Sequence, residues 1–313
     1  VCKKGLWVVD DSLTKAVRPD SEKKSSNGKS SSSGKNNPSS PVASPCKTET
    51  EDNCEYGTLT DDRDGQTYKI VKIGEQWWMA ENLNYAYTDV PFKYRSYTSD
   101  STSWCYDNDA ANCAKYGRLY TWAAAMDSVG TWSTNGMGCG YYMECSPTNP
   151  VRGICPEGWH LPDITEWNAL FNAVGGKRTA GIMLKSTEGW KDNGNGSDAY
   201  SFSALPAGYR YSDGNFSDEG NYANFWSSME LNSINAYGIY LYYDYDNESL
   251  GNNYKYNGFS VRCLKDYGPD SEKMSSNDKS SSSEKNSSSS SIVSSNSSSS
   301  SVVPTVSVAS PCK

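Results

Sequence analysis

Short alternating runs of hydrophobic and polar residues dominate the middle of the chain, a pattern typical of β-strands. Around residues 66–78, two such runs are separated by Gly74, and this arrangement predicts a β-hairpin. After Trp190, further runs rich in tyrosine are separated by Gly, Asn and Asp, the residues that favour turns. These runs predict strands within residues 200–211, 222–230, 235–246 and 257–266.

Two segments show the wider spacing of apolar residues that is typical of helices. Residues 118–128 contain an alanine run, and we expect a helix packed on a sheet there. Residues 163–174 carry the clearer signal, since Asp163 can cap the helix, Glu166 completes a capping box and Gly175 ends it. Two helices beside many short strands predict a small α+β domain with a twisted, mostly antiparallel sheet.

Two nearly identical serine-rich segments flank this region. Residues 19–36 and 269–286 differ at only three of 18 positions, and both are low in apolar residues. Such a composition buries too little apolar surface to offset the entropy of ordering, so we expect flexible, disordered linkers. The repeat indicates a module in a tethered array. It divides the chain into a remnant of a preceding module (1–17), a linker (18–45), the module itself (46–266), a second linker (267–310) and the start of a next module (311–313).

The composition argues against two classes of partner. Lys and Arg total 29 against 37 Asp and Glu, which gives a formal net charge of -8. Because nucleic acids and anionic membranes attract basic surfaces, we expect no nucleic-acid partner. The sequence also lacks a run of about 18 apolar residues, so we expect no membrane insertion.

Ten cysteines and one histidine, without Cys-x-x-Cys motifs, favour disulfide bonds over a zinc site. Disulfides form in oxidising compartments, which predicts a secreted protein that is extracellular or at the cell surface. Cys2 and Cys312 fall outside the module, and spacing alone does not fix the connectivity of the other eight. The pairs that the spacing favours are Cys46–Cys54, Cys105–Cys113, Cys139–Cys145 and Cys155–Cys263.

The sequence gives little support to catalytic chemistry. His160 is the one candidate histidine base, and its place between Trp159 and Leu161 favours a packed structural role. The sequence contains no motif of the serine hydrolases, zinc proteases or nucleotide-binding enzymes. We therefore expect that the protein is not an enzyme.

Calcium is the one cofactor that the sequence raises. Two clusters, residues 192–198 and 244–248, concentrate the carboxylate and amide oxygens that hard cations prefer as ligands. The alternative is that both clusters are simple turns, because Asp, Asn and Gly favour turns and neither cluster has EF-hand spacing. The candidate calcium ligands are Asp192, Asp198, Asp244 and Asp246.

A tyrosine-rich strand is the main candidate for ligand binding. Tyr240 and Tyr242 fall on one face of the expected strand, opposite Ile239 and Leu241. We expect this aromatic face to stack on sugar rings, with Tyr209, Tyr211, Trp226, Tyr240 and Tyr242 as its members. The alternative is that these rings only cover a half-buried sheet.

Six stretches of the module resemble the Fibrobacter succinogenes major paralogous domain. They are DDRDGQTYKIVKIGEQWWMAENLNY (61–85), YGRLYTWAAAMD (116–127), GICPEGWHLPDITEW (153–167), FSALPAGYR (202–210), FWSS (225–228) and GFSVRCLKD (258–266). The resemblance implies a secreted or surface protein of bacteria, since the family occurs there beside serine-rich linkers. The GWHLP core and the late Cys263 are also similar to the C-type lectin and sulfatase-modifying-factor superfold. That similarity implies a C-type-lectin-like architecture closed by a Cys155–Cys263 bond, and it does not by itself imply sugar binding.

We therefore expect a non-catalytic extracellular module that mediates adhesion or binds carbohydrate. Its expected partners are polysaccharide or another surface polymer, together with neighbouring modules that add avidity. One alternative is a structural spacer or surface-coat domain without a ligand. Another is an enzyme related to the sulfatase-modifying factors, which rely on reactive cysteines, whereas every module cysteine here has an expected disulfide partner.

Overall fold

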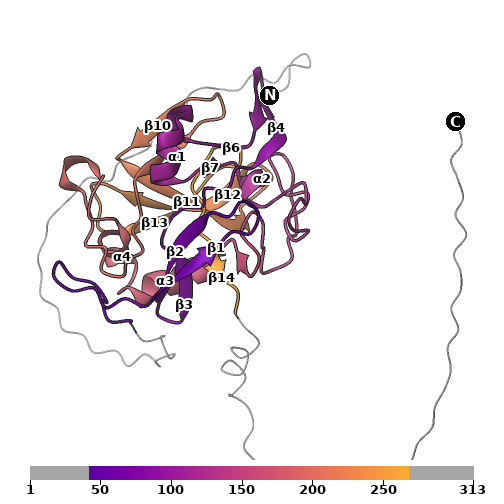
Figure 1. The fold of residues 1–313 in the computed structure, drawn as a ribbon. Coiled ribbons are helices and arrows are strands. Elements are labelled where there is room, and N and C mark those ends of the chain that lie inside the picture. Colours follow the sequence, from indigo (N-terminus) through magenta and orange to yellow (C-terminus); the bar gives the residue numbers. More distant parts are fainter. Residues whose placement is uncertain (1–41, 268–313) are drawn as a thin grey trace, which may run out of the picture. The chain divides into compact units, whose positions relative to one another are not determined.

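The computed structural model describes residues 42–267 (Figure 1). The flanking segments 1–17 and 311–313 lie outside these residues, as does almost all of the two predicted linkers. The described part is a mixed α+β fold with mostly antiparallel sheets, few helices and four disulfide bonds. The fold class expected from the sequence is confirmed at this level.

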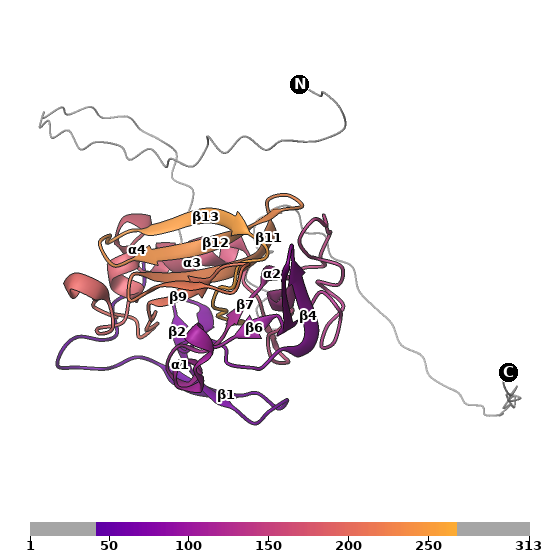
Figure 2. The same ribbon diagram turned by 90° about the horizontal axis from the view of Figure 1, so that it is seen from above.

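Two five-stranded sheets form the framework, and Figure 2 shows β11–β13 on one side of the molecule and β1 and β2 on the other. The first sheet has the order β1 (Tyr56–Thr60), β2 (Thr67–Ile73), β3 (Gln76–Met79), β14 (Leu264–Lys265) and β8 (Trp159–His160). The second has the order β10 (Phe216–Glu219), β9 (Ala207–Arg210), β11 (Tyr222–Glu230), β12 (Asn235–Tyr242) and β13 (Glu248–Tyr254). In this second sheet β9 and β11 run parallel, and the other pairs are antiparallel.

The hairpin predicted around Gly74 is confirmed as β2 and β3, which pair from Ile70 opposite Met79 to Ile73 opposite Gln76. Gly74 has a φ of 60°, a conformation that glycine adopts without a steric penalty. The runs predicted as strands after Trp190 contain β9, β11, β12 and β14. The alternating pattern therefore identified most strands of the central sheets.

Shorter elements lie around the two sheets. They are the hairpin β4 (Thr88–Tyr94) and β5 (Tyr97–Ser101), the pair β6 (Ser103–Trp104) and β7 (Leu119–Tyr120), the helices α1 (Ala110–Tyr116), α2 (Trp122–Ala125), α3 (Ile164–Ala173) and α4 (Lys177–Leu184), and the 3-10 turns η2 (Tyr106–Asn108) and η3 (Lys191–Asn193). Within residues 42–267, no helix has the length and apolar character needed to span a lipid bilayer.

The expectation of two helices was wrong, because the described residues form four α-helices. Helix α3 is confirmed with its capping box, in which Asp163 and Glu166 each accept the other's backbone N–H at 2.9 Å. Of the helix predicted within residues 118–128, the structure contains only the single turn α2, because Leu119 and Tyr120 before it form strand β7. Helix α4 was missed because it starts directly after Gly176, where the pattern indicated a stop, and contains Gly181. A Cβ at Gly181 would lie 2.6 Å from the carbonyl oxygen of Asn247, so close packing explains this glycine.

The central strands β11 and β12 of the second sheet are largely buried on both faces. On one face, Phe225, Ile239 and Leu241 join a core that contains Trp167 of α3 and Trp78 of β3, whose ring centres are 4.8 Å apart. On the other face, Trp226 and Tyr240 join a second core, which also includes residues of α2 and the loops around it. Because β11 and β12 lie between two apolar cores, neither of their faces is broadly open to solvent.

Four disulfide bonds join Cys46–Cys54, Cys105–Cys113, Cys139–Cys145 and Cys155–Cys263, the same pairs that the spacing favoured. All eight cysteines of residues 42–267 are therefore bonded. Four disulfides in one module are typical of proteins that fold in an oxidising compartment.

Candidate functional site

The aromatic face expected from the sequence does not form a single exposed surface. Trp226 is fully buried, stacks on Phe259 with ring centres 4.3 Å apart, and donates its indole N–H to the carbonyl of Tyr120. Tyr240 is 9% exposed and belongs to the same core. A sugar ring therefore cannot stack on these two side chains, and their assignment to the site was wrong. The physical reason is that a second core covers the face of β12 that was expected to be open.

The other three predicted aromatic residues lie in two separate places. Tyr209 and Tyr211 share a hydrogen bond of 2.5 Å between their hydroxyls, and only Tyr211 is exposed. Tyr242 is half-buried and contacts Tyr222 edge to face, with ring centres 5.0 Å apart. These contacts are typical of rings that cover a sheet, which was the alternative reading of the pattern.

The predicted calcium ligands do not converge. Residues 42–267 contain no group of three or more His, Cys, Asp or Glu side chains that could hold a metal ion. Asp198 is buried and forms an ion pair of 2.9 Å with Lys47, while Asp192 lies on the exposed turn η3. The cation close to Asp244 and Asp246 is the ammonium of Lys185, which donates to the carbonyls of Tyr242 and Tyr245 at 3.0 and 3.1 Å. Burial lowers the pKa of Lys185, and the two carboxylates oppose this shift.

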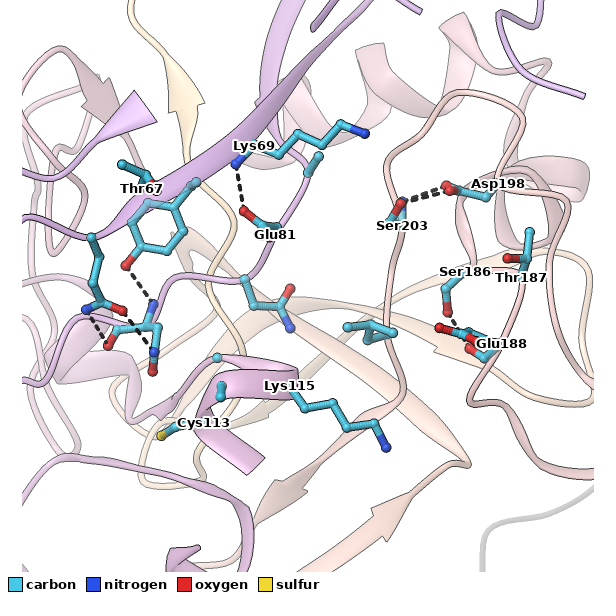
Figure 3. A pocket seen from close by; sticks show the side chains of 18 of the residues that line it. Thr67, Lys69, Glu81, Cys113, Lys115, Ser186, Thr187, Glu188, Asp198 and Ser203 are labelled. Atoms are coloured by element: carbon cyan, nitrogen blue, oxygen red, sulfur yellow. Dashed lines mark hydrogen bonds between the residues drawn. The ribbon is translucent and has the colours of Figure 1, made fainter. Parts of the chain in front are cut away.

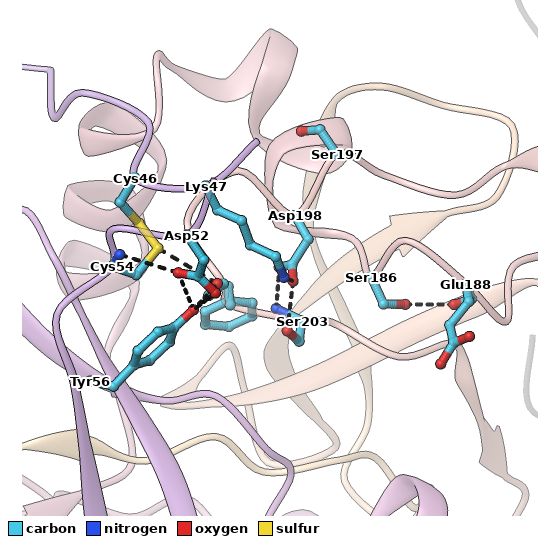
Figure 4. Close-up of polar contacts among 12 residues, drawn as sticks. Cys46, Lys47, Asp52, Cys54, Tyr56, Ser186, Glu188, Ser197, Asp198 and Ser203 are labelled. Carbon is cyan, nitrogen blue, oxygen red and sulfur yellow. Dashed lines mark hydrogen bonds and ion pairs between the residues drawn. A yellow bond between two sulfur atoms is a disulfide. The ribbon is translucent and has the colours of Figure 1, made fainter. Parts of the chain in front are cut away.

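A polar pocket of about 430 Å³ lies between β2, α1 and two later loops (Figure 3). Two of its carboxylates are already engaged by the protein. Glu81 accepts the backbone N–H of Lys69 at 2.6 Å, and Asp198 accepts both the N–H and the hydroxyl of Ser203. Figure 4 shows Lys47 held on Asp198, near the Cys46–Cys54 bond. We conclude that this polar network mainly fastens the N-terminal segment to the fold.

His160 has the structural role expected from its neighbours. Its side chain is buried, and Nε2 lies 2.8 Å from Oε1 of Glu166, the carboxylate that also caps helix α3. Because both oxygens of Glu166 are engaged in this way, His160 ties strand β8 to the start of α3.

The most exposed aromatic group of the described residues is one that the sequence did not single out. We call it the tyrosine cluster, and its members are Tyr94, Tyr141, Tyr142, Tyr254 and Tyr256. Consecutive ring centres are 4.1 to 5.8 Å apart, from Tyr142 through Tyr141, Tyr94 and Tyr256 to Tyr254. Tyr142 is 71% exposed and Tyr254 is 47% exposed. Burial raises the pKa of Tyr141 and of Tyr256, and the hydrogen bonds to Tyr142 and Tyr94 act in the same direction.

Lys255 holds the loop that carries Tyr141 and Tyr142. Its side chain is completely buried, and the ammonium donates to the carbonyls of Gly140 and Met143 at 3.2 and 2.9 Å. It also forms an ion pair of 2.5 Å with Glu230, whose other oxygen accepts the N–H of Cys145. The Cys139–Cys145 bond closes the same loop. These bonds fix the loop backbone on both sides of the two tyrosines.

Three apolar side chains that lie in sequence beside residues of this region are also exposed. Met143 lies next to the cluster in sequence, and Met229 and Leu231 flank Glu230, the carboxylate that Lys255 binds. All three side chains are more than 40% exposed.

A second hollow has a volume of about 460 Å³. It is lined by residues 85–88 together with Val90, Val129, Thr131 and Trp132, and part of this lining belongs to β4, the strand that carries Tyr94. Tyr85 and Trp132 line it in an edge-to-face contact with ring centres 5.7 Å apart. The guanidinium of Arg63 lies 4.0 Å from the ring centre of Tyr85 and is held by the buried Asp61. Aromatic side chains therefore line this hollow as well.

A model of the Fibrobacter succinogenes major domain matches residues 71–265, more than half of the chain. The chain belongs to this family. No curated protein and no solved structure matches the chain. The match includes all five members of the tyrosine cluster and the Cys155–Cys263 bond.

The family match also separates two parts of the described residues. The loop closed by Cys46–Cys54 precedes residue 71 and lies outside the Fibrobacter succinogenes major domain match. The ion pair between Lys47 and Asp198 therefore links a residue outside the matched range to one within it, whereas the tyrosine cluster lies wholly within that range.

Proposed function

We propose that the module is a non-catalytic extracellular domain that binds polysaccharide on its tyrosine cluster. The observation that carries this proposal is the gathering of five tyrosine rings from three separate segments, with Tyr142 and Tyr254 strongly exposed. The electron-rich face of an aromatic ring attracts the C–H bonds on the flat face of a pyranose ring. The phenol hydroxyls at the edges of the rings can exchange hydrogen bonds with sugar hydroxyls.

The rigidity of the cluster supports the same proposal. The Cys139–Cys145 bond and the contacts of Lys255 restrict the loop before any ligand binds. Binding to a surface that is already ordered avoids the entropy cost of ordering it. A preformed aromatic surface therefore suits weak binding to a polymer that offers many equivalent sites.

The disulfides and the family support the cellular setting of this proposal. We place the protein outside the cell or at the surface of a bacterium, with residues 46–266 as the lectin-like module and the serine-rich segments as flexible tethers. A C-type-lectin-like architecture accords with the Cys155–Cys263 bond. Cys155 lies shortly before β8 and Cys263 directly before β14, so the bond links the segments that lead into these two strands. Tethered modules that each bind weakly gain avidity, because the first contact raises the effective concentration for the next.

Two observations favour a binding function over a catalytic one. The eight cysteines of residues 42–267 are all paired, whereas the sulfatase-modifying relatives of the superfold need reactive ones. His160 is buried, contacts Glu166, and is not one of the residues that line the polar pocket. These contacts make a modifying enzyme the weaker proposal.

The test is a pull-down on insoluble cellulose, xylan and pectin with the wild type, Tyr142→Ala and Tyr254→Ala. We expect each substitution to weaken binding about fivefold or more, because loss of a stacking contact with one aromatic ring costs about 1 kcal/mol or more, as it does for stacked nucleobases. The matched control is Tyr245→Ala, an equally exposed tyrosine at the opposite end of the β12–β13 hairpin. Chelation of calcium should leave binding unchanged. Failure of the wild type to bind any of these polymers would refute the proposal and favour a spacer domain without a ligand.

A further inference from the structure

One positive charge stands beside the tyrosine cluster. Arg95 forms the tip of the β4–β5 hairpin, where Tyr94 pairs with Tyr97, and its side chain is exposed. The guanidinium carbon lies 5.2 Å from the ring centre of Tyr94. Burial raises the pKa of Tyr256, and the charge of Arg95 opposes that shift, which places Arg95 near a second ring of the cluster as well.

Among the side chains that the structure describes, no carboxylate forms an ion pair with the guanidinium of Arg95. Glu230, the carboxylate beneath the loop of Tyr141 and Tyr142, is already paired with the buried Lys255. The five donors of Arg95 are thus available to a ligand that rests on the rings. A guanidinium is a planar, two-pronged partner for a carboxylate, a match that neutral sugars do not offer.

We infer that the tyrosine cluster selects acidic polysaccharides, whose uronic-acid carboxylate binds Arg95 while the sugar rings stack on the tyrosines. This inference rests on the function proposed above and specifies its substrate class. The overall charge of the chain is -8, so an acidic polymer gains no general attraction from the protein. Selection must therefore come from a local cation at the binding surface, and Arg95 is the exposed cation in contact with the cluster.

The experiment compares three soluble polymers by affinity electrophoresis: polygalacturonate, its fully methyl-esterified form and a neutral β-glucan. Esterification removes the carboxylate charge and keeps the sugar ring, so it isolates the contact with Arg95. We expect the wild type to bind polygalacturonate about two- to fivefold more tightly than the ester, the range of an exposed ion pair. Added salt should reduce this preference, because an exposed ion pair is screened.

The decisive variant is Arg95→Gln, with Arg178→Gln as its control. Arg178 is also exposed, but it lies on α4, on the other side of the molecule from β4 (Figure 1). Arg95→Gln should abolish the preference for polygalacturonate over the ester, whereas Arg178→Gln should keep that preference. Equal binding of acid and ester by the wild type would overturn the inference while leaving glycan binding intact. Absence of binding to all three polymers would overturn the proposed function itself.

Discussion

Replacement of Lys255 by methionine tests whether a buried cation organises the loop that carries Tyr141 and Tyr142. Methionine fills a similar volume and keeps the contact with the ring of Trp122, whose centre lies 4.5 Å from the ammonium. It cannot donate to Glu230 or to the loop carbonyls. The substitution therefore removes charge and hydrogen bonds with little change in packing.

The expected loss of stability is about 3–4 kcal/mol. Removal of one partner from a buried ion pair typically costs about 3–5 kcal/mol, because the other charge is left uncompensated. The side chain of Glu230 is 17% exposed, so water offsets part of this cost and the lower end of the range applies. Lys115→Met is the matched control, since Lys115 also lies over an aromatic ring, at 4.4 Å from that of Tyr116, but is largely exposed. Its loss should be less than about 1 kcal/mol.

Urea unfolding of the oxidised protein measures both free energies, and the double variant Lys255→Met/Glu230→Gln completes a mutant cycle. We expect the double variant to be more stable than the sum of the single losses predicts, because it leaves no unpaired charge. Chymotrypsin gives an independent readout: cleavage after Tyr141 or Tyr142 should become faster in Lys255→Met. A loss no larger than that of Lys115→Met, with unchanged cleavage, would refute the idea that Lys255 organises the loop.

Two further predictions concern stability. Burial raises the pKa of Glu248, so the stability it contributes is present at low pH and is lost as the pH rises through the raised pKa. Glu248→Gln should therefore increase the free energy of unfolding at pH 7 and have little effect well below pH 4.5, as urea unfolding at both pH values would show. Removal of the Cys155–Cys263 bond, which spans 108 residues, should cost about 2 kcal/mol more than removal of Cys46–Cys54, which spans 8, because loop-closure entropy grows with loop length. Equal losses in thermal unfolding of the two double-alanine variants would contradict this account.

The elements that local sequence determines could be predicted. The β2–β3 hairpin depends on alternation around one glycine, and α3 on a capping box within four residues, and both are present. Spacing favoured the three cysteine pairs that close loops with separations of 6 to 8 residues, and position along the module favoured the fourth, Cys155–Cys263. Helix α4 could not be predicted in this way, since its Gly181 is explained by contact with residues 246–247, far away in sequence.

The exposure of the candidate aromatic residues depended on tertiary contacts, which left Trp226 and Tyr240 buried. Alternation along β12 correctly separated Tyr240 from Ile239, but it could not reveal that a second core covers the side of Tyr240. Tyr142 and Tyr254 gave a signal of another kind. Tyr141 and Tyr142 occur in a loop rich in Gly and Cys, whereas Tyr254 ends β13 in a segment rich in Asn and Gly. Tyrosines that fall outside a regular alternating pattern are therefore a further signal for exposed aromatic side chains.

Buried cations explain how this fold keeps long irregular loops in place. Lys185 binds carbonyls of the turn after β12, Lys255 those of the loop around Tyr142, and Arg262 those of Phe202 and Ser203. Carbonyls in irregular backbone lack the partners that a helix or strand supplies, and a buried ammonium or guanidinium donates several hydrogen bonds at once. The cation gains solvation from the loop, and the loop gains a fixed shape from the cation. Exposed tyrosines on such a loop can then stay in position without a regular element beneath them, which is the property that a binding surface on an irregular loop requires.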